Sequence, residues 1–233
     1  MIDFHSHILP GVDDGSKDTK ESLALLDMLY CQGVDAVVAT PHYNAENETP
    51  AEFAARRNEA FESLKCLLTE NHPRIILGAE VAYYEGVSRL EGLEKLCIEN
   101  TNILLLEMPM SRWTDYVLKE LRVLSSAKGL TILLAHIERY MAFQSSSVWK
   151  ELRKLGILTQ VNASFFNRFL SRGKAVSMLS KGEINAVGSD CHNLSQRPPA
   201  MGEAADVIRR KLGENFLLDF TEYHNSLLFD DIG

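Results

Sequence analysis

Seven short apolar runs alternate with stretches of helical periodicity along almost the whole chain. Several of these runs, such as residues 36–40 and 131–135, are nearly continuous and rich in β-branched residues or leucine, which is typical of strands buried on both faces of a parallel sheet. Strands that alternate with helices at this spacing predict βα units. The seven predicted strands lie within residues 1–7, 36–40, 75–79, 103–106, 131–135, 158–161 and 184–188.

The predicted helices follow from capping and periodicity. Asp18 and Glu21 have the spacing of a capping box, and Thr49 precedes a proline that suits a first helical position. Apolar periodicity continues after each start until a glycine or a polar segment ends it. We therefore expect helices at about residues 18–32, 49–70, 114–128, 147–155, 174–181, 202–212 and 214–220.

A polar residue follows the end of every predicted strand, and this distribution favours one kind of parallel sheet. In an open sheet, functional residues gather near one switch point, whereas in a (β/α) barrel all strand ends face one mouth. No glycine-rich phosphate loop follows the first strand, which disfavours nucleotide binding. We expect an α/β fold with a closed or nearly closed barrel. The chain shows no linker or shift in composition, so we expect a single domain over residues 1–233.

Composition excludes several classes of function. The formal net charge of −8 disfavours nucleic acid as a partner, because such binding depends on cationic side chains that neutralise phosphates. No apolar run of about 18 residues is present for membrane insertion, and the first residues lack the basic start of a signal peptide. Four widely spaced cysteines indicate reduced thiols. We expect a soluble, cytoplasmic protein; the oligomeric state does not follow from the sequence.

The residues at the strand ends are the types that bind metal ions. His5 and His7 are two apart in an extended segment, so both imidazoles point to the same side. Either Asp13 or Asp14 could return to them after the turn at Pro10. His72 and His224 lie outside the pattern and are predicted at the surface. The candidate ligands are His5, His7, Asp14, His42, Glu80, Glu107, His136, Asp190 and His192.

Nine candidate ligands are too many for one ion, since a zinc or manganese site uses about four to six. Buried carboxylates also need cations among them, because an unpaired buried charge is costly. Two or three divalent ions are therefore predicted. Mixed imidazole and carboxylate ligands suit manganese, iron or zinc.

The motifs that carry these ligands resemble a known superfamily. They are His5–Gly15 (HSHILPGVDDG), ATPH ending at His42, GAE ending at Glu80, AHIER beginning at Ala135 and SDCHN beginning at Ser189. In this order they look like the polymerase-and-histidinol-phosphatase (PHP) superfamily. They are most similar to its bacterial capsule-regulating, manganese-dependent protein tyrosine phosphatases. The resemblance runs across nearly the whole chain.

The resemblance implies a distorted seven-stranded (β/α) barrel with a trinuclear metal centre, most often of manganese. It favours Asp14 over Asp13 as a ligand and assigns phosphate binding to Arg139 and Arg197. The implied substrate is the phosphorylated, tyrosine-rich C-terminal tail of a bacterial tyrosine kinase that controls capsule and exopolysaccharide synthesis. Two departures, Tyr43 after His42 and Ile137 after His136, remove no candidate ligand.

Charge supports a phosphate monoester as the substrate. Four carboxylates and three divalent ions leave about +2 at the centre, whereas two ions leave about zero, and bound ions dominate local electrostatics. The expected nucleophile is a metal-bridging hydroxide, from water whose pKa is lowered toward about 7. Arg139 and Arg197 would hold the nonbridging oxygens. A phenolate with a pKa near 10 leaves readily, so we assign no general acid.

Cys191 and Arg197 also match Cys-x5-Arg, the spacing of cysteine-dependent tyrosine phosphatases. The segment between them has no glycine to wrap around a phosphate, and Pro198 follows the arginine. We interpret Cys191 as a packed small residue.

Two alternative functions remain open from the sequence. One is a PHP phosphatase for a small phosphoester such as histidinol phosphate. The other belongs to a different class, a catalytically silent module that binds a kinase tail. A metal-dependent nuclease or amidohydrolase is disfavoured by the acidic charge and by the lack of a lysine at a strand end.

Overall fold

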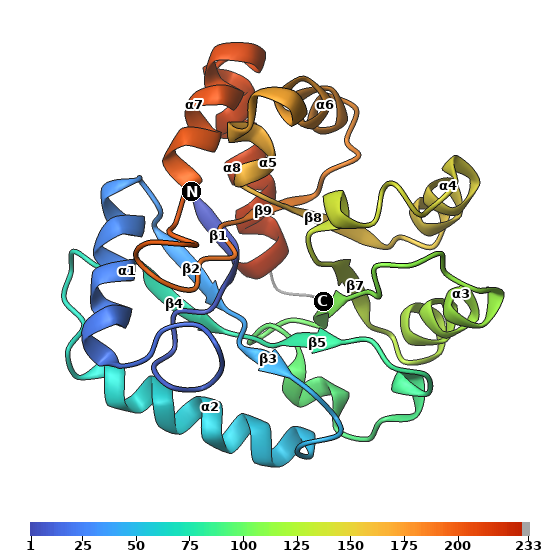
Figure 1. Ribbon diagram of the computed structural model, residues 1–233, viewed down its shortest axis with the longest axis horizontal. Helices are drawn as coiled ribbons and strands as arrows, with labels where there is room; N and C mark the ends of the chain where they lie inside the picture. The colour runs from blue at the N-terminus through green and yellow to red at the C-terminus, as the bar shows by residue number, and fades with distance from the viewer. Residues whose placement is uncertain (230–233) are drawn as a thin grey trace.

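The computed structural model describes residues 1–229, and all strand pairs in it are parallel. One sheet has the order β1-β2-β4, with β1 at Ile2–Ser6, β2 at Ala36–Ala39 and β4 at Arg74–Leu77. A six-stranded sheet, which curls in Figure 1, has the order β3-β5-β6-β7-β8-β9. Its strands are β3 (His42–Tyr43), β5 (Glu80–Ala82), β6 (Ile103–Glu107), β7 (Thr131–Leu134), β8 (Leu158–Asn162) and β9 (Ala186–Gly188). The α/β class is confirmed.

The count of seven strands is not confirmed, because residues 1–229 form nine strands. Each predicted segment overlaps one strand, and the two extra strands, β3 and β5, follow β2 and β4 after two-residue breaks. The first break includes Pro41, which has no N–H for a strand ladder, and the second includes Gly78. Backbone bonds continue across the second break, since Gly78 N donates to Ala39 O at 2.9 Å.

The segment after β9 lies along β1. Asp190 N donates to His5 O at 2.7 Å, and His7 N donates to Cys191 O at 2.9 Å. Inside the fold, Asp3 Oδ1 accepts a hydrogen bond from Ser189 N at 2.7 Å. These bonds join the first strand to the end of the last βα unit.

Helices surround the strands in Figure 1. Of the capping box expected at Asp18, one half forms, in which Asp18 accepts from Glu21 N. Thr49 caps the next helix as expected and forms a full reciprocal box with Glu52. The helices are α1 (Thr19–Cys31), α2 (Pro50–Lys65), α3 (Asp115–Arg122), α4 (Ser146–Lys154), α5 (Ser164–Asn167), α6 (Phe169–Ser180), α7 (Met201–Leu212) and α8 (Glu214–Phe229). Shorter turns are η1 (Val87–Arg89), η2 (Leu93–Leu96), a π-helical turn η3 (Val123–Ala127) and η4 (Ile137–Arg139).

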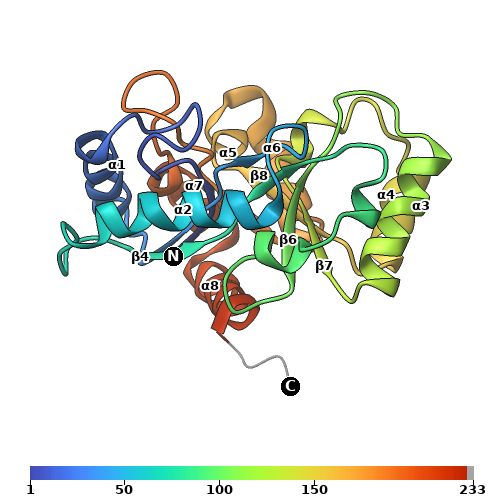
Figure 2. The same cartoon turned by 90° about the horizontal axis from the view of Figure 1, so that it is seen from below.

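Two helix predictions need correction. The helix expected near residue 174 begins at Phe169, and the last helix extends to Phe229 rather than to residue 220. Figure 2 shows α8 on the side of the strands away from the long loops. Leu228 of α8 packs there with Phe4 and Leu133 of the strands. A larger apolar layer fills the space between the strands and the outer helices.

Across residues 1–229, no helix combines the length and apolarity needed to cross a bilayer.

Candidate metal centre

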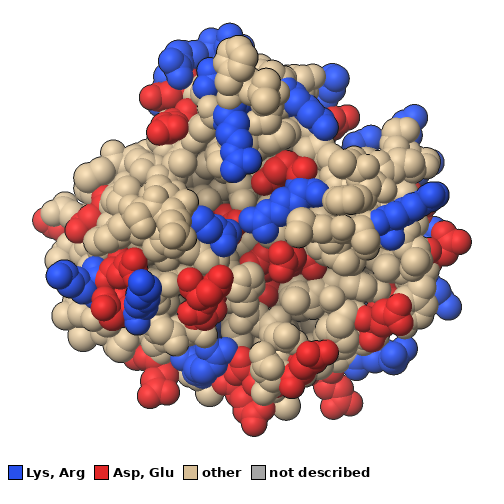
Figure 3. Space-filling model, in the orientation of Figure 1, with Lys and Arg blue, Asp and Glu red and all other residues tan. Residues whose placement is uncertain are grey.

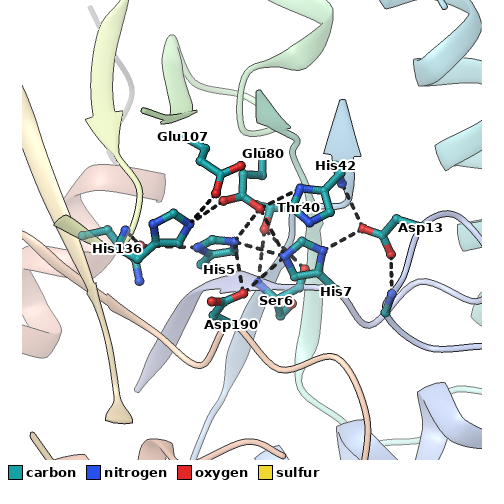
Figure 4. Close-up of polar contacts among 12 residues, drawn as sticks. His5, Ser6, His7, Asp13, Thr40, His42, Glu80, Glu107, His136 and Asp190 are labelled. Atoms are coloured by element: carbon teal, nitrogen blue, oxygen red, sulfur yellow. Dashed lines mark hydrogen bonds and ion pairs between the residues drawn. The ribbon is translucent and has the colours of Figure 1, made fainter. Parts of the chain in front are cut away.

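The carboxyl ends of the strands meet at one face, which we call the mouth, and the nine candidate ligands lie there. Figure 4 labels all of them except Asp14 and His192. They come from β1 or the turn after it, from β3, β5 and β6, and from the loops after β7 and β9. Their ligand atoms form four overlapping groups, in each of which all atoms lie within 4.8 Å of one another. The groups are His7, Asp14, His42 and His192; His5, His7 and Asp190; His5, Glu80 and His136; and His42, Glu80 and Glu107.

The two histidines of the first strand behave as their spacing predicts. His5 Nε2 and His7 Nε2 lie 3.2 Å apart, and both side chains are fully buried. Each Nε2 also faces Asp190 Oδ1, at 3.8 Å from His5 and 3.5 Å from His7. The extended backbone of β1 therefore delivers two imidazoles to a single point, and the loop after β9 adds the carboxylate of Asp190.

Glu80 lies at the centre of the cluster, with its side chain 1% exposed. Its Oε2 is 3.2 Å from His5 Nε2 and 3.0 Å from His42 Nδ1. Its Oε1 is 2.8 Å from His136 Nε2. Burial alone would raise the pKa of this carboxyl, but the neighbouring imidazoles hold it well below its usual range. A buried anion among imidazole nitrogens is a donor set that fits divalent transition metals.

The two adjacent aspartates have different positions. Asp13 Oδ2 is 2.7 Å from His7 Nδ1 and accepts from His42 N at 2.9 Å. Asp14 Oδ1 instead lies 3.5 Å from His42 Nε2 and 3.4 Å from His192 Nε2. Asp14 thus lies beside the candidate ligands, while Asp13 orients the ring of His7 from behind, a role that sequence reasoning missed.

Three further side chains orient the cluster and were also missed. Tyr140 Oη lies 2.9 Å from His136 Nδ1, Gln160 Oε1 accepts from His136 N at 2.6 Å, and Asn162 Nδ2 donates to Asp190 Oδ2 at 2.7 Å. Partners of this kind fix the ring orientation and tautomer of a metal-binding histidine. Gln160 and Asn162 had a sequence signal, because they are polar residues at the end of a buried strand.

His136 and Asp190 have left-handed backbone conformations, with φ of 31° and 53°. Residues other than glycine rarely adopt such conformations, and those that do concentrate at functional sites. Here the conformation turns each side chain back over the strand ends that precede it.

Both arginines implied by the resemblance lie at the rim of the cluster. Arg139 Nη2 is 2.5 Å from Asp190 Oδ2, and Arg197 Nη2 is 2.5 Å from Asp190 Oδ1. Arg197 Nη1 also lies 2.9 Å from His192 Nε2. Their side chains are 34% and 40% exposed, so they border solvent and the buried centre. Figure 3 shows basic and acidic side chains next to one another at the centre of this face.

Cys191 is fully buried, and burial raises the pKa of its thiol, which opposes thiolate chemistry. The prediction of a packed residue therefore agrees with its position. The prediction for His224 is wrong: this side chain is 4% exposed and packs under β1. The His72 side chain is only 9% exposed, with its Nε2 3.2 Å from Asp27 Oδ1, so it too is largely buried rather than at the surface.

The fold and the cluster define a class: an α/β protein whose parallel strands present a candidate metal centre at their carboxyl ends. The model of the family described as "Capsular polysaccharide synthesis, CpsB/CapC" matches residues 1–227. The chain belongs to this family, as the resemblance in its motifs implied.

Named relatives cover the chain nearly end to end. Tyrosine-protein phosphatase CpsB of Streptococcus pneumoniae is 35% identical over 230 residues, which is 91% of each chain. Tyrosine-protein phosphatase YwqE of Bacillus subtilis is 30% identical over 237 residues, which is 98% of this chain and 91% of the relative. A solved structure from work on YwqE and CpsB, described there as unique metal-dependent tyrosine phosphatases, has a TM-score of 0.82 at 24% identity and covers 97% of this chain and 94% of that one. This structural likeness supports the fold.

Proposed function

We propose that the protein is a metal-dependent protein-tyrosine phosphatase. The observation that carries the proposal is the set of four overlapping histidine and carboxylate groups at one mouth, with two arginines at its rim. The names of the CpsB and YwqE relatives support phosphotyrosine as the substrate.

The proposed metal ligands are the nine residues of the four groups. Two or three divalent ions would share these ligands, and manganese is the metal that we favour. Divalent ions bound there would supply the hydroxide nucleophile by lowering the pKa of water and would offset the charge of the phosphate. Glu80 would hold the ions through both carboxylate oxygens, because Oε2 lies beside His5 and Oε1 lies beside His136. Tyr140 and Gln160 hold His136 in place, and Asp13 holds His7.

Arg139 and Arg197 are the proposed phosphate-binding residues. Both guanidinium groups lie against Asp190 and are partly exposed, so each can turn a planar pair of donors toward a phosphate at the mouth. Their fixed charge would stabilise the transferring group while the phenolate leaves.

Further parts of the proposal concern context. The substrate would be the C-terminal tail of a bacterial tyrosine kinase in capsule synthesis; the description of the family supports the link to capsule synthesis. Four free thiols fit action in the cytoplasm. The family match over residues 1–227 supports a single domain. Counting β2 with β3 and β4 with β5 as interrupted strands would make the two sheets one distorted seven-stranded barrel.

A small phosphoester such as histidinol phosphate is the alternative substrate, and a silent kinase-tail binding module is the alternative of another class. The residues of the mouth do not favour either alternative over the proposed function, because a cluster that holds its metal ions could bind any phosphate monoester.

The test is phosphate release from a phosphotyrosine peptide and from histidinol phosphate, with metal content measured on the same samples. We expect manganese-loaded protein to prefer the peptide, and His136→Ala to lose both bound metal and turnover. His72→Ala, which removes a largely buried histidine outside the mouth, is the control and should keep both. Preference for histidinol phosphate, or peptide binding by metal-replete protein without phosphate release, would refute the proposal.

A further inference from the structure

A large cavity adjoins the two arginines. Its volume is about 920 Å³, and its wall includes Arg139, Asp190 and Arg197 on one side. The opposite wall is formed by α5 and the first turn of α6. Pockets of about 300–1,000 Å³ hold whole drug-sized ligands, so this cavity has room for more than a phosphate group. It is continuous with the proposed phosphate site through the shared residues.

Two adjacent apolar side chains at this wall point into solvent. Phe169 is 87% exposed and Leu170 is 95% exposed, the highest fractions among the exposed large apolar side chains of residues 1–229. The preceding aromatic residues, Phe165 and Phe166, are buried in the core. Single exposed apolar residues are common, but a neighbouring pair beside a candidate active site is typical of a surface that binds an apolar partner.

The backbone that carries the pair is held firmly. Ser171 Oγ donates to Phe165 O at 2.7 Å, and Arg172 Nε donates to Phe166 O at 3.1 Å. Asn167 Nδ2 donates to Ala200 O at 3.1 Å, which ties α5 to the residue before α7. These bonds fold Ser171 and Arg172 back onto α5 and leave Phe169 and Leu170 outside. A surface fixed in this way loses little conformational freedom when a ligand binds.

The same segment has a distinct charge. Residues 163–182 contain Arg168, Arg172, Lys174 and Lys181 and no acidic residue, in a chain whose formal net charge is −8. In Figure 3, uncharged atoms over α5 and α6 are flanked by basic side chains. Acidic residues on a ligand would find complementary charge beside the apolar pair. Of the four basic residues, Arg168 lines the cavity, whereas Lys174 and Lys181 line a separate pocket. Glu138 and Glu203 also line the cavity, so Arg168 is the cation that lies beside the apolar pair.

We infer that Phe169 and Leu170 dock an apolar residue that flanks the phosphotyrosine of a polypeptide substrate, with acidic residues of that substrate beside the basic α5–α6 segment. This inference rests on the proposed function. The occupant is a peptide because the docking wall and the phosphate site share one cavity, which a flanking stretch of chain can cross. Phe169 and Leu170 would contact the flanking residue equally in the bound substrate and in the transition state. Loss of the pair should therefore raise KM and leave kcat unchanged.

The experiment uses the metal-loaded full chain and the double variant Phe169→Ser/Leu170→Ser. Substrates are p-nitrophenyl phosphate, a phosphotyrosine peptide with apolar and acidic neighbours, and a phosphotyrosine peptide with glycine and serine neighbours. We expect the variant to raise KM about tenfold for the first peptide only, which corresponds to about 1.4 kcal/mol. The values of kcat and the turnover of p-nitrophenyl phosphate should not change. Leu218→Ser, 54% exposed on α8, is the matched control and should change nothing.

A second variant tests the charge. Arg168→Glu should raise KM for the acidic peptide and not for the neutral one, with a stronger effect at low salt. Equal KM values in wild type and both variants would overturn the inference and leave the proposed phosphatase intact. The same would follow if the apolar pair proved to hold two copies of this chain together, with the double variant monomeric and its peptide KM unchanged.

A separate binding measurement distinguishes failure of the proposed phosphatase function from failure of the docking inference. If wild-type protein releases no phosphate from any phosphotyrosine substrate, fluorescence anisotropy with the labelled acidic peptide measures docking directly. Binding by wild type and at least about tenfold weaker binding by Phe169→Ser/Leu170→Ser would support docking without catalysis. Equal binding, or none by either protein, would overturn the inference as well.

Discussion

The protein buries histidines in two regions, and their surroundings differ completely. At the mouth, His5, His7 and His136 lie among the carboxylates of Glu80 and Asp190. His224 of α8 lies on the opposite side of the strands from the mouth, between Phe4 and Phe220, with ring centroids 4.7 and 4.1 Å away. We call this region, formed by α8 and Phe4, the floor. The only hydrogen bond of His224 among the described residues is between Nε2 and Asn185 O, at 3.1 Å.

The pKa values follow these surroundings. Burial alone would lower the pKa of His5 and His7, but Glu80, Asp13 and Asp190 raise it. At His136 burial outweighs the contact with Glu80, and its pKa is lowered. At the floor no carboxylate of residues 1–229 opposes burial, which lowers the pKa of His224 to about 3. Burial therefore does not identify a functional histidine. The anionic neighbours do, because they make the site attractive to any cation.

The largest expected effect comes from removing the central charge of the mouth. Glu80→Gln should lower phosphatase activity at least about 100-fold and reduce bound metal, since a neutral amide is a poor ligand for several ions. The matched control is Glu120→Gln. Glu120 is also buried, but it accepts hydrogen bonds from Tyr83, Gly86 and Ser88 away from the mouth. The control should lose stability and keep metal and activity; equal loss of activity in both variants would contradict the comparison.

At the floor, the expected effect is on stability. The unfolded chain protonates His224 near pH 6.5, whereas the folded protein excludes that proton until about pH 3. Protonation of His224 in the unfolded chain therefore lowers the free energy of unfolding as the pH falls below 6.5. Above pH 6.5 this destabilising effect is absent. Between pH 8 and pH 5 the loss should be about 2 kcal/mol.

Urea unfolding of wild type and His224→Leu at several pH values measures this contribution. The variant should lack that part of the pH dependence while its metal content and turnover at pH 8 stay like those of wild type. If the two proteins lost stability in parallel on acidification, His224 would not be the titrating group.

A smaller effect is expected behind the mouth. Asp13→Asn weakens the anchor of His7 without removing a proposed ligand, so activity should fall about tenfold, with weaker metal binding. Asp206→Asn, which alters an exposed ion pair with Arg209, serves as the control. Metal titrations that give the same affinity for Asp13→Asn and wild type would mean that Asp13 does not position His7 for metal binding.

The smallest effect is expected at Cys191. Cys191→Ser should keep activity within about twofold of wild type, whereas a chelator should abolish activity and added manganese should restore it. Loss of turnover in a serine variant that still holds its metal would instead identify Cys191 as the nucleophile.

Much of the mouth was predictable because its geometry follows from local rules. The two-residue spacing of His5 and His7 fixes their shared direction, and parallel strands bring Glu80, Glu107 and Asp190 to one edge. The choice between Asp13 and Asp14 was not predictable from spacing. It depends on a turn in which Asp13 Oδ1 accepts from Gly15 N.

The floor and the docking wall were not predictable in this way. The buried residues of α8, Leu217, His224 and Leu228, share one face of the helix. Apolar periodicity predicts such a face but does not predict which helix will cover this side of the strands. The start of α6 was placed too late because Phe169 and Leu170 have no apolar partners to give a helical pattern. Apolar side chains that are exposed because they bind a ligand do not follow the apolar periodicity from which helices are predicted.

The bond between Ser189 N and the buried carboxylate of Asp3 joins residues that are 186 positions apart. The contacts of β1 with β2 can form early in folding, but this bond must wait until nearly the entire chain has been made and the last βα unit has formed. Such long-range closure is slow, because its entropic cost precedes its stabilising contacts. A chain still growing on the ribosome therefore carries His5 and His7 without the carboxylate of Asp190, and the mouth is among the last parts of the molecule to be completed.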